Sequence, residues 1–244
     1  MILLLDVGNT RVKWAWLEYV ELAPAGAVAH DTSHRSWQAE IEADGHRPTR
    51  IVVANVAGPA FAAALTLWSR DHYAIEPEFI VAGSTLLGVE NSYRRPASLG
   101  VDRWLGLIAA WQSAPCAALV VNSGTAFTVD ALDGDGRHRG GLIVPGVQMM
   151  TEIAARLTAP DLLEPGAGLA GLPADPVRLA LAALADRARI ELAASVGAEP
   201  RLLLTGGDAA ELEPHLAAPA EVVPDLVLAG LAIAINGVPA GARR

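Results

Sequence analysis

Two short polar motifs, each after an apolar run, carry residue types that suit phosphate binding. The first runs from Asp6 to Thr10 (Asp-Val-Gly-Asn-Thr) after the apolar run at residues 2–5, and Lys13 follows it closely. A glycine lets a ligand approach the backbone, and turn amides and hydroxyls donate to phosphate oxygens. A carboxylate such as Asp6 holds Mg²⁺ directly or through water, and Lys13 balances phosphate charge. The first motif therefore indicates a loop for the phosphates of a nucleotide.

The second motif repeats the first about half the chain later. It runs from Asn122 to Ala126 (Asn-Ser-Gly-Thr-Ala) after an apolar run at residues 117–121, and offers the hydroxyls of Thr125 and Thr128. A third glycine turn lies at residues 205–207. One such turn indicates a plain tight hairpin as readily as a ligand site, but the repetition favours nucleotide binding. Two facing tips would clamp a triphosphate.

The elements that must position these motifs follow an α/β pattern. Each motif is expected at a hairpin tip between two strands. Further strands are predicted at residues 50–54, 79–81 and 201–204, and helices at 59–70, 99–111, 177–195 and 226–235. Because the motif is repeated, we expect two duplicated lobes, residues 1–115 and 116–244, with a nucleotide cleft between them.

Composition excludes several classes of protein. With 52% hydrophobic and 18% charged residues, the chain of 244 residues is not disordered. The net charge of −9 argues against a nucleic-acid partner, which requires clustered Lys and Arg. The single cysteine, Cys116, forms no intramolecular disulfide. No apolar stretch is long enough to span a membrane and no secretory signal is visible, so we expect a soluble cytoplasmic protein with no membrane partner.

Two histidines, His30 and His34, lie four residues apart. Their segment is polar and offers no other ligand for zinc. We therefore expect both to be surface residues.

Six segments, in order over residues 2–235, resemble the type III pantothenate kinases. That family belongs to the actin-like and sugar-kinase ATPase superfamily and is related to the Bvg accessory factors. The first segment, 6–13, together with the second, 100–103, forms a combination that is specific to this family. The segments are 6–13 (Asp-Val-Gly-Asn-Thr-Arg-Val-Lys), 100–103 (Gly-Val-Asp-Arg), 124–130 (Gly-Thr-Ala-Phe-Thr-Val-Asp), 141–146 (Gly-Leu-Ile-Val-Pro-Gly), 205–208 (Thr-Gly-Gly-Asp) and 224–231 (Pro-Asp-Leu-Val-Leu-Ala-Gly-Leu).

The resemblance implies a fold, a reaction and partners. Each lobe is expected to be built on a ribonuclease H-like sheet. The expected reaction is the ATP-dependent phosphorylation of pantothenate to 4'-phosphopantothenate, the first step of coenzyme A biosynthesis. The implied cofactors are Mg²⁺ and a monovalent cation, K⁺ or NH₄⁺, and the implied assembly is a homodimer with the late helices near its interface.

The resemblance also assigns roles to individual residues. ATP would contact Asp6, Val7, Gly8, Asn9, Thr10, Arg11, Val12, Lys13 and Thr125. Pantothenate would contact Tyr93, Gly100, Val101, Asp102, Arg103 and Val177, with Asp102 as general base.

The chemistry agrees with the roles of Asp102 and Arg103. An alcohol must lose its proton as it attacks the γ-phosphoryl group, and a carboxylate at a helix mouth can take that proton. The guanidinium of Arg103 suits the carboxylate of pantothenate. The alternatives are a capping or first-turn acid for Asp102, a structural ion pair for Arg103 and a loop anchor for Tyr93.

Two positions depart from the family pattern. Asn122 stands where the family has the aspartate associated with K⁺ or NH₄⁺; its carbonyl oxygen still coordinates a cation but adds no charge, which argues against dependence on that cation. Val177 stands where the family has a substrate-contacting threonine. These departures leave two alternative functions open: a non-catalytic nucleotide-binding accessory or regulatory factor, or a kinase for another small alcohol.

Overall fold

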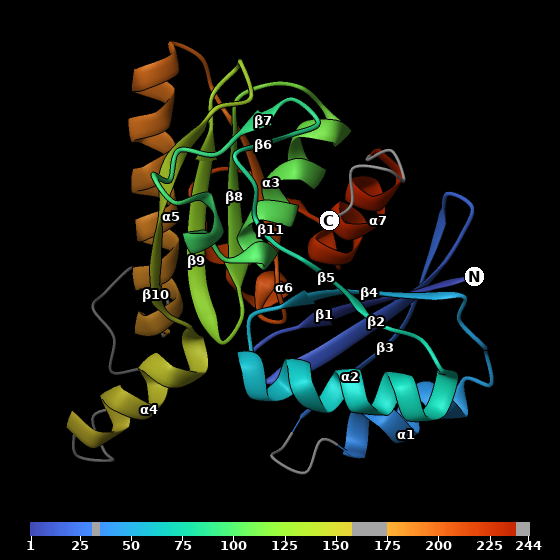
Figure 1. Ribbon diagram of the computed structural model, residues 1–244. Coiled ribbons are helices and arrows are strands. Elements are labelled where there is room, and N and C mark those ends of the chain that lie inside the picture. The colour runs from blue at the N-terminus through green and yellow to red at the C-terminus, as the bar shows by residue number, and fades with distance from the viewer. Residues whose placement is uncertain (31–34, 158–174, 238–244) are drawn as a thin grey trace. The chain divides into compact units, whose positions relative to one another are not determined.

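The computed structural model describes residues 1–30, 35–157 and 175–237 of the chain. It divides into two compact units (Figure 1). Unit 1 comprises Met1–Ser113 together with the segment that starts at Asp225, and unit 2 comprises Ala114–Pro224.

Unit 1 is built on a five-stranded sheet of order β3-β2-β1-β4-β5. β1 pairs antiparallel with β2, as does β2 with β3, whereas β4 and β5 run parallel to β1. The bounds are β1 Ile2–Val7, β2 Arg11–Glu18, β3 Glu21–Ala29, β4 Arg50–Asn55 and β5 Glu78–Ile80.

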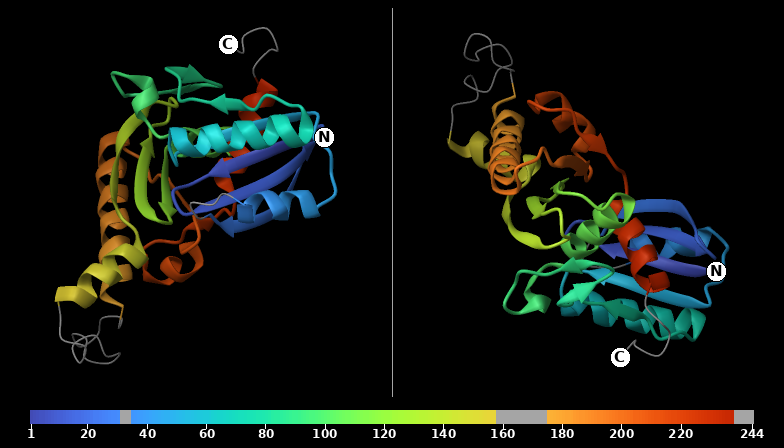
Figure 2. Two further views of the ribbon diagram at one scale, coloured as in Figure 1. Left: turned by 60° about the horizontal axis from the view of Figure 1, so that its bottom comes forward. Right: turned by 90° about the horizontal axis from the view of Figure 1, so that it is seen from above.

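Helices cover both faces of this sheet. α1 (Arg35–Ala43) and α2 (Pro59–Tyr73) lie on one face, and α3 (Val101–Ser113) and α7 (Leu226–Gly237) lie on the other (Figures 1 and 2). The first face buries an aromatic core in which Trp37, Phe61 and Trp68 pack against the strands. A short hairpin of β6 (Thr85–Leu86) and β7 (Val89–Glu90) and the 3₁₀ helix Pro96–Ser98 lead into α3.

Unit 2 repeats the sheet of unit 1. Its order is β10-β9-β8-β11-β12, and the directions of its pairings match those of unit 1 strand for strand. The bounds are β8 Ala118–Ser123, β9 Ala126–Leu132, β10 His138–Pro145, β11 Arg201–Thr205 and β12 Glu221–Val222. The α/β fold of two duplicated lobes, predicted from the repeated motif, is therefore confirmed.

The helices of unit 2 resemble those of unit 1 less closely than the strands do. They are α4 (Val147–Leu157), α5 (Pro176–Val196), α6 (Ala209–Leu212) and the 3₁₀ helix Glu213–His215. The Pro- and Gly-rich sequence of residues 159–176 predicts an irregular loop, and almost all of it lies outside the described residues. No helix within the described ranges combines the length and apolarity of a membrane span.

The division of the chain differs from the predicted lobes 1–115 and 116–244 in the place of α7. The prediction put residues 226–235 in the second lobe, whereas the structure groups α7 with unit 1. α7 is apolar almost all round and packs on α3, β1 and β4. A side chain at Gly230 would collide with the backbone of Leu105, because its Cβ would lie 2.1 Å from that carbonyl oxygen. This close approach between α3 and α7 cannot be seen in a linear pattern.

Candidate active site

The tip of the first hairpin contains most of the residues predicted to bind ATP. β1 and β2 pair as far as Val7 and Val12, whose side chains are fully buried in the core. The amide of Gly8 donates to the carbonyl of Arg11 over 3.0 Å and closes the turn. Asn9 and Thr10 are exposed at its end. The buried side chains of Val7 and Val12 thus support the turn, and residues 8–11 form the turn itself, with Asn9 and Thr10 exposed.

Asp6 and Lys13 lie opposite each other at the base of this tip. The Nζ atom of Lys13 forms an ion pair with Oδ1 of Asp225 at 2.9 Å. Asp225 precedes α7, has a positive φ of 54°, and its carbonyl accepts the amide of Ala229. Asp is among the residues that tolerate this backbone conformation. The sequence places Asp225 in the segment 224–231 that carries the family resemblance, but it gives Asp225 no role of its own.

Asp6 has a strongly shifted pKa. Burial, the charge of Asp102 and the charge of Asp225 raise its pKa to about 7, against the opposing effect of Lys13. The three carboxylates and Lys13 therefore lie within electrostatic range of one another in unit 1. A carboxyl group that is costly to ionise gains most from a bound cation.

The donor set around Asp6 agrees with a Mg²⁺ site of the usual nucleotide type. Among the described residues, no group of three or more His, Cys, Asp or Glu side chains forms a metal cage. Mg²⁺ in nucleotide sites is held by one or two carboxylates together with phosphates and water. Asp6 can supply such a carboxylate.

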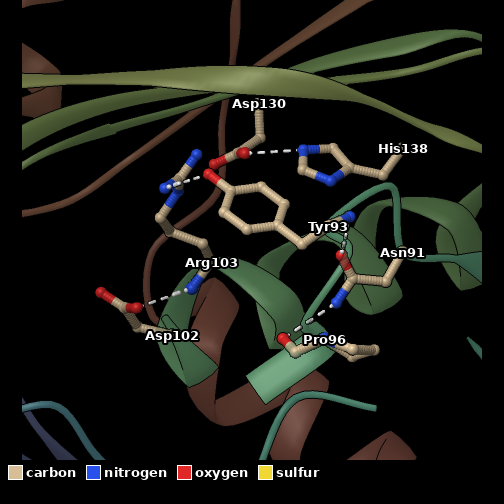
Figure 3. Close-up of polar contacts among 7 residues, drawn as sticks. All are labelled: Asn91, Tyr93, Pro96, Asp102, Arg103, Asp130 and His138. Carbon is tan, nitrogen blue, oxygen red and sulfur yellow. Dashed lines mark hydrogen bonds and ion pairs between the residues drawn. The ribbon is translucent and has the colours of Figure 1, made fainter. Parts of the chain in front are cut away.

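Asp102 lies in the first turn of α3, and its Oδ1 accepts the amide of Arg103 over 2.8 Å (Figure 3). A Cβ on Gly100 would lie only 2.5 Å from that same oxygen. Glycine at position 100 therefore leaves the room that the Asp102 carboxylate occupies. The neighbouring Val101 is buried in the helix packing.

Arg103 and Tyr93 lie together in the same unit. Nη1 of Arg103 donates to the hydroxyl oxygen of Tyr93 over 3.3 Å (Figure 3). The loop that carries Tyr93 is fixed by Asn91, whose Oδ1 accepts the amide of Tyr93 over 3.0 Å. The amide group of Asn91 donates to the carbonyls of Gly83 and Pro96. The sequence does not indicate this role of Asn91, because a single Asn in a loop has no distinctive pattern around it.

The tip of the second hairpin carries Thr125 and Asn122. Thr125 is exposed, and its carbonyl accepts the amide of Gly146 over 3.0 Å. Asn122 pairs in register with Thr128 on one side and Thr205 on the other. The surroundings of Asn122 thus offer neutral oxygens. Gly206, with φ of 102°, packs on the backbone of Ser123.

Val177 lies in the first turn of α5, where Asp175 caps the helix by accepting the amide of Arg178 over 2.9 Å. The side chain of Val177 is half-buried against the core of unit 2.

Unit 2 also contains a buried carboxylate–histidine pair that the sequence did not reveal. Asp130 and His138 are both buried and lie on adjacent strands, with Nε2 of His138 2.9 Å from Oδ1 of Asp130 (Figure 3).

Comparison with known proteins gives one consistent family. Residues 2–162 match the family model for type III pantothenate kinase. A type III pantothenate kinase from Nitrosococcus oceani is 38% identical, covering 95% of this chain and 92% of that protein. Another, from Thiobacillus denitrificans, is also 38% identical and covers 94% of both chains.

A solved structure shows the same fold at low identity. A ROK family glucokinase from Streptomyces griseus, in complex with glucose and AMPPNP, superposes with a TM-score of 0.51 at 13% identity. The match covers 96% of this chain and 98% of the glucokinase. The architecture is therefore that of the actin-like sugar-kinase ATPases, and by sequence the chain belongs to the type III pantothenate kinase family.

Proposed function

We propose that this protein transfers the γ-phosphoryl group of ATP to the hydroxyl of pantothenate, with Asp102 as the general base. Membership of the family supports the reaction and its place as the first step of coenzyme A biosynthesis. One observation carries the role of Asp102: Gly100 leaves space for its carboxylate at the mouth of α3, beside Arg103.

ATP binding is assigned to the two hairpin tips. The exposed turn at residues 8–11 offers amides and the hydroxyl of Thr10 to the phosphates, and Thr125 offers a second contact. Asp6 would hold Mg²⁺, which when bound offsets the charge of the phosphates. Lys13, oriented by Asp225, adds a positive charge at the base of the first tip.

Pantothenate binding is assigned to the loop and helix of unit 1. The guanidinium of Arg103 pairs with the substrate carboxylate, and the Tyr93 hydroxyl holds that guanidinium in place. The carboxylate of Asp102 takes the proton of the substrate hydroxyl. The resulting oxygen forms a bond to the γ-phosphorus, the bond from that phosphorus to the β–γ bridging oxygen breaks, and ADP leaves.

Three further features complete the proposal. Asn122 and its threonine neighbours supply only neutral oxygens, so K⁺ or NH₄⁺ is expected to have little effect on turnover. The protein is expected to work in the cytoplasm. It is also expected to form a homodimer, and exposed apolar side chains on β10 and α4, among them Ile143 and Ile153, are available for such a contact.

The variant Asp102→Asn tests the general base. Turnover, measured as pantothenate-dependent ADP release with MgATP, is expected to fall by about 10²–10⁴-fold, the usual contribution of a general base. Binding of a fluorescent ATP analogue should change by less than about twofold. The same substitution at exposed Asp71 on α2 is the matched control and should leave both measurements unchanged.

Normal turnover of the Asp102→Asn variant would remove Asp102 from this role. If the wild-type protein binds ATP tightly but transfers nothing to pantothenate, the accessory-factor function is favoured instead. Transfer to another small alcohol would favour a kinase of different specificity, and the replacement of threonine by Val177 is the observation that motivates that assay.

A further inference from the structure

His30 contacts the first hairpin tip at two places. It follows β3, and its backbone amide donates to the carbonyl of Thr10 over 3.0 Å. A nitrogen of its ring, Nε2, lies 2.8 Å from the carbonyl oxygen of Gly8. Because a carbonyl only accepts, Nε2 must carry the proton of this hydrogen bond. The expectation that His30 is merely a surface residue does not account for these contacts.

The ring of His30 also packs against the aromatic core of unit 1. It packs edge-on against Phe61, with ring centroids 4.9 Å apart and an interplanar angle of 62°. Phe61 is 2% exposed and belongs to α2 and to the aromatic core of unit 1. A buried residue therefore fixes the direction in which the ring donates.

The hydrogen bond to Gly8 determines where the next amide points. The carbonyl of Gly8 and the amide of Asn9 belong to one planar trans peptide group, so they point in opposite directions. When His30 binds the carbonyl, the N–H of Asn9 is directed away from the histidine. A turn that receives phosphates must present N–H groups, since a carbonyl oxygen in their place would repel the phosphate oxygens.

We propose that His30 is a positioning residue for the phosphate-binding turn, holding the Gly8–Asn9 peptide with its N–H group toward the nucleotide. This inference rests on the proposed binding of ATP at residues 8–11. It adds a residue that acts through the turn and does not itself touch the substrate.

Two pairs of variants isolate the hydrogen bond. His30→Phe keeps a ring against Phe61 but removes the donor. His30→Gln supplies a side-chain N–H at a similar reach, whereas the amide of His30→Asn is one methylene shorter. The matched control is His46→Phe, because exposed His46 also packs against an aromatic ring in unit 1, that of Trp16.

Loss of one net hydrogen bond corresponds to about a fivefold effect. The Kd of a fluorescent ATP analogue and the KM for MgATP are expected to rise about fivefold in His30→Phe and His30→Asn. His30→Gln should stay within about twofold of the wild type. The KM for pantothenate and kcat should not change, and His46→Phe should behave as the wild type.

Three results would overturn the inference. One is an unchanged Kd and KM for ATP in both His30→Phe and His30→Asn. Another is equal impairment of His30→Gln and His30→Asn, and the third is an equal rise in the KM for pantothenate, which would indicate general structural damage. Nucleotide binding is measured without pantothenate, so the two proposals fail separately. If the wild type binds ATP but phosphorylates nothing, the proposed function fails while His30 is still tested by binding. A wild type that binds no ATP removes both.

Discussion

The two hairpin tips occupy the same place in two sheets of the same topology, yet their chemistry differs. In unit 1, residues 8–11 lie between the last paired residues, Val7 and Val12. In unit 2, residues 124–126 lie between Ser123 and Phe127, so the second tip is one residue shorter. The pair at the base of the first tip is Asp6 opposite Lys13, and the corresponding pair of the second is Asn122 opposite Thr128.

The two tips are also supported differently. The first is held partly by side chains, since His30 binds Gly8 and Asp225 binds Lys13. The second is held by the backbone: the amide of Gly146 donates to Thr125, and the amide of Asp208 donates to Ser123. The two sheets thus share their strand order and pairing directions, whereas Asp6, Lys13 and Asp225 gather only at the first tip. The repeat therefore predicts where a tip lies, whereas the side chains at the base of the tip determine its chemistry.

The largest change in unfolding free energy is expected from Asp6→Asn, which gives the base of the first tip the residue type found at Asn122 in the second. The folded pKa of Asp6 is raised to about 7 from 3.8, so the folded protein binds its proton more tightly than the unfolded chain does. Stability is therefore expected to fall as pH rises through this window. At 1.36 kcal/mol per pKa unit, the variant should be more stable than the wild type at pH 8 by up to about 4 kcal/mol.

Denaturant unfolding from pH 4 to pH 8 measures this effect. The difference in unfolding free energy between Asp6→Asn and the wild type should shrink toward pH 4, where the folded wild type keeps the proton on Asp6 and the unfolded chain begins to bind it. A difference that is the same at all pH values would contradict a raised pKa at Asp6.

A smaller effect is expected from Gly146→Ala, which probes the backbone support of the second tip. The new Cβ would lie 1.9 Å from the carbonyl oxygen of Gly124, so the backbone must shift. We expect a loss of about 2–3 kcal/mol in the free energy of unfolding, as for other overpacked sites. Gly134→Ala is the control, because nothing lies within 4 Å of its Cβ. Equal stability of the two variants would show that the second tip is not held in this way.

The smallest effect is expected from Gly8→Ala, the corresponding glycine change in the first tip. Its Cβ would meet only the carbonyl oxygen of Arg11, at an ordinary contact distance of 3.4 Å. Unfolding should therefore change by less than about 0.5 kcal/mol. The KM for MgATP should rise about tenfold, since the methyl group obstructs close approach of the phosphates. An unchanged KM would mean that Gly8 serves only the turn.

The sequence predicted the parts of this molecule that depend on local pattern. The strands on either side of both tips and the helices α2, α3 and α5 follow from apolar periodicity and turn residues. β3 was missed because its residues, including Pro24, are mostly exposed and lack large alternating side chains. Pro in an edge strand removes no hydrogen bond that the sheet needs.

The parts that were missed depend on contacts between distant segments. Asp225 meets Lys13 across 212 positions of sequence, and His30 meets Gly8 across 22. Neither contact leaves a periodic signal, so the motif that contains Gly8 and Lys13 does not indicate its distant partners. The predicted roles of Asp102, Arg103 and Tyr93 came from the family resemblance, because each residue type also suits a capping or anchoring role.

The return of the chain to unit 1 at Asp225 has a consequence for biosynthesis. Residues 1–113 leave the ribosome before unit 2, but α7, which helps to cover one face of their sheet, leaves the exit tunnel only after the whole of unit 2. The strands and helices of unit 2 are contiguous in sequence, so they can fold while translation continues. Until α7 emerges, the apolar residues of β1, β4 and α3 that α7 contacts stay uncovered. A nascent chain stalled before residue 225 should therefore be protected from protease in unit 2 and remain sensitive in unit 1.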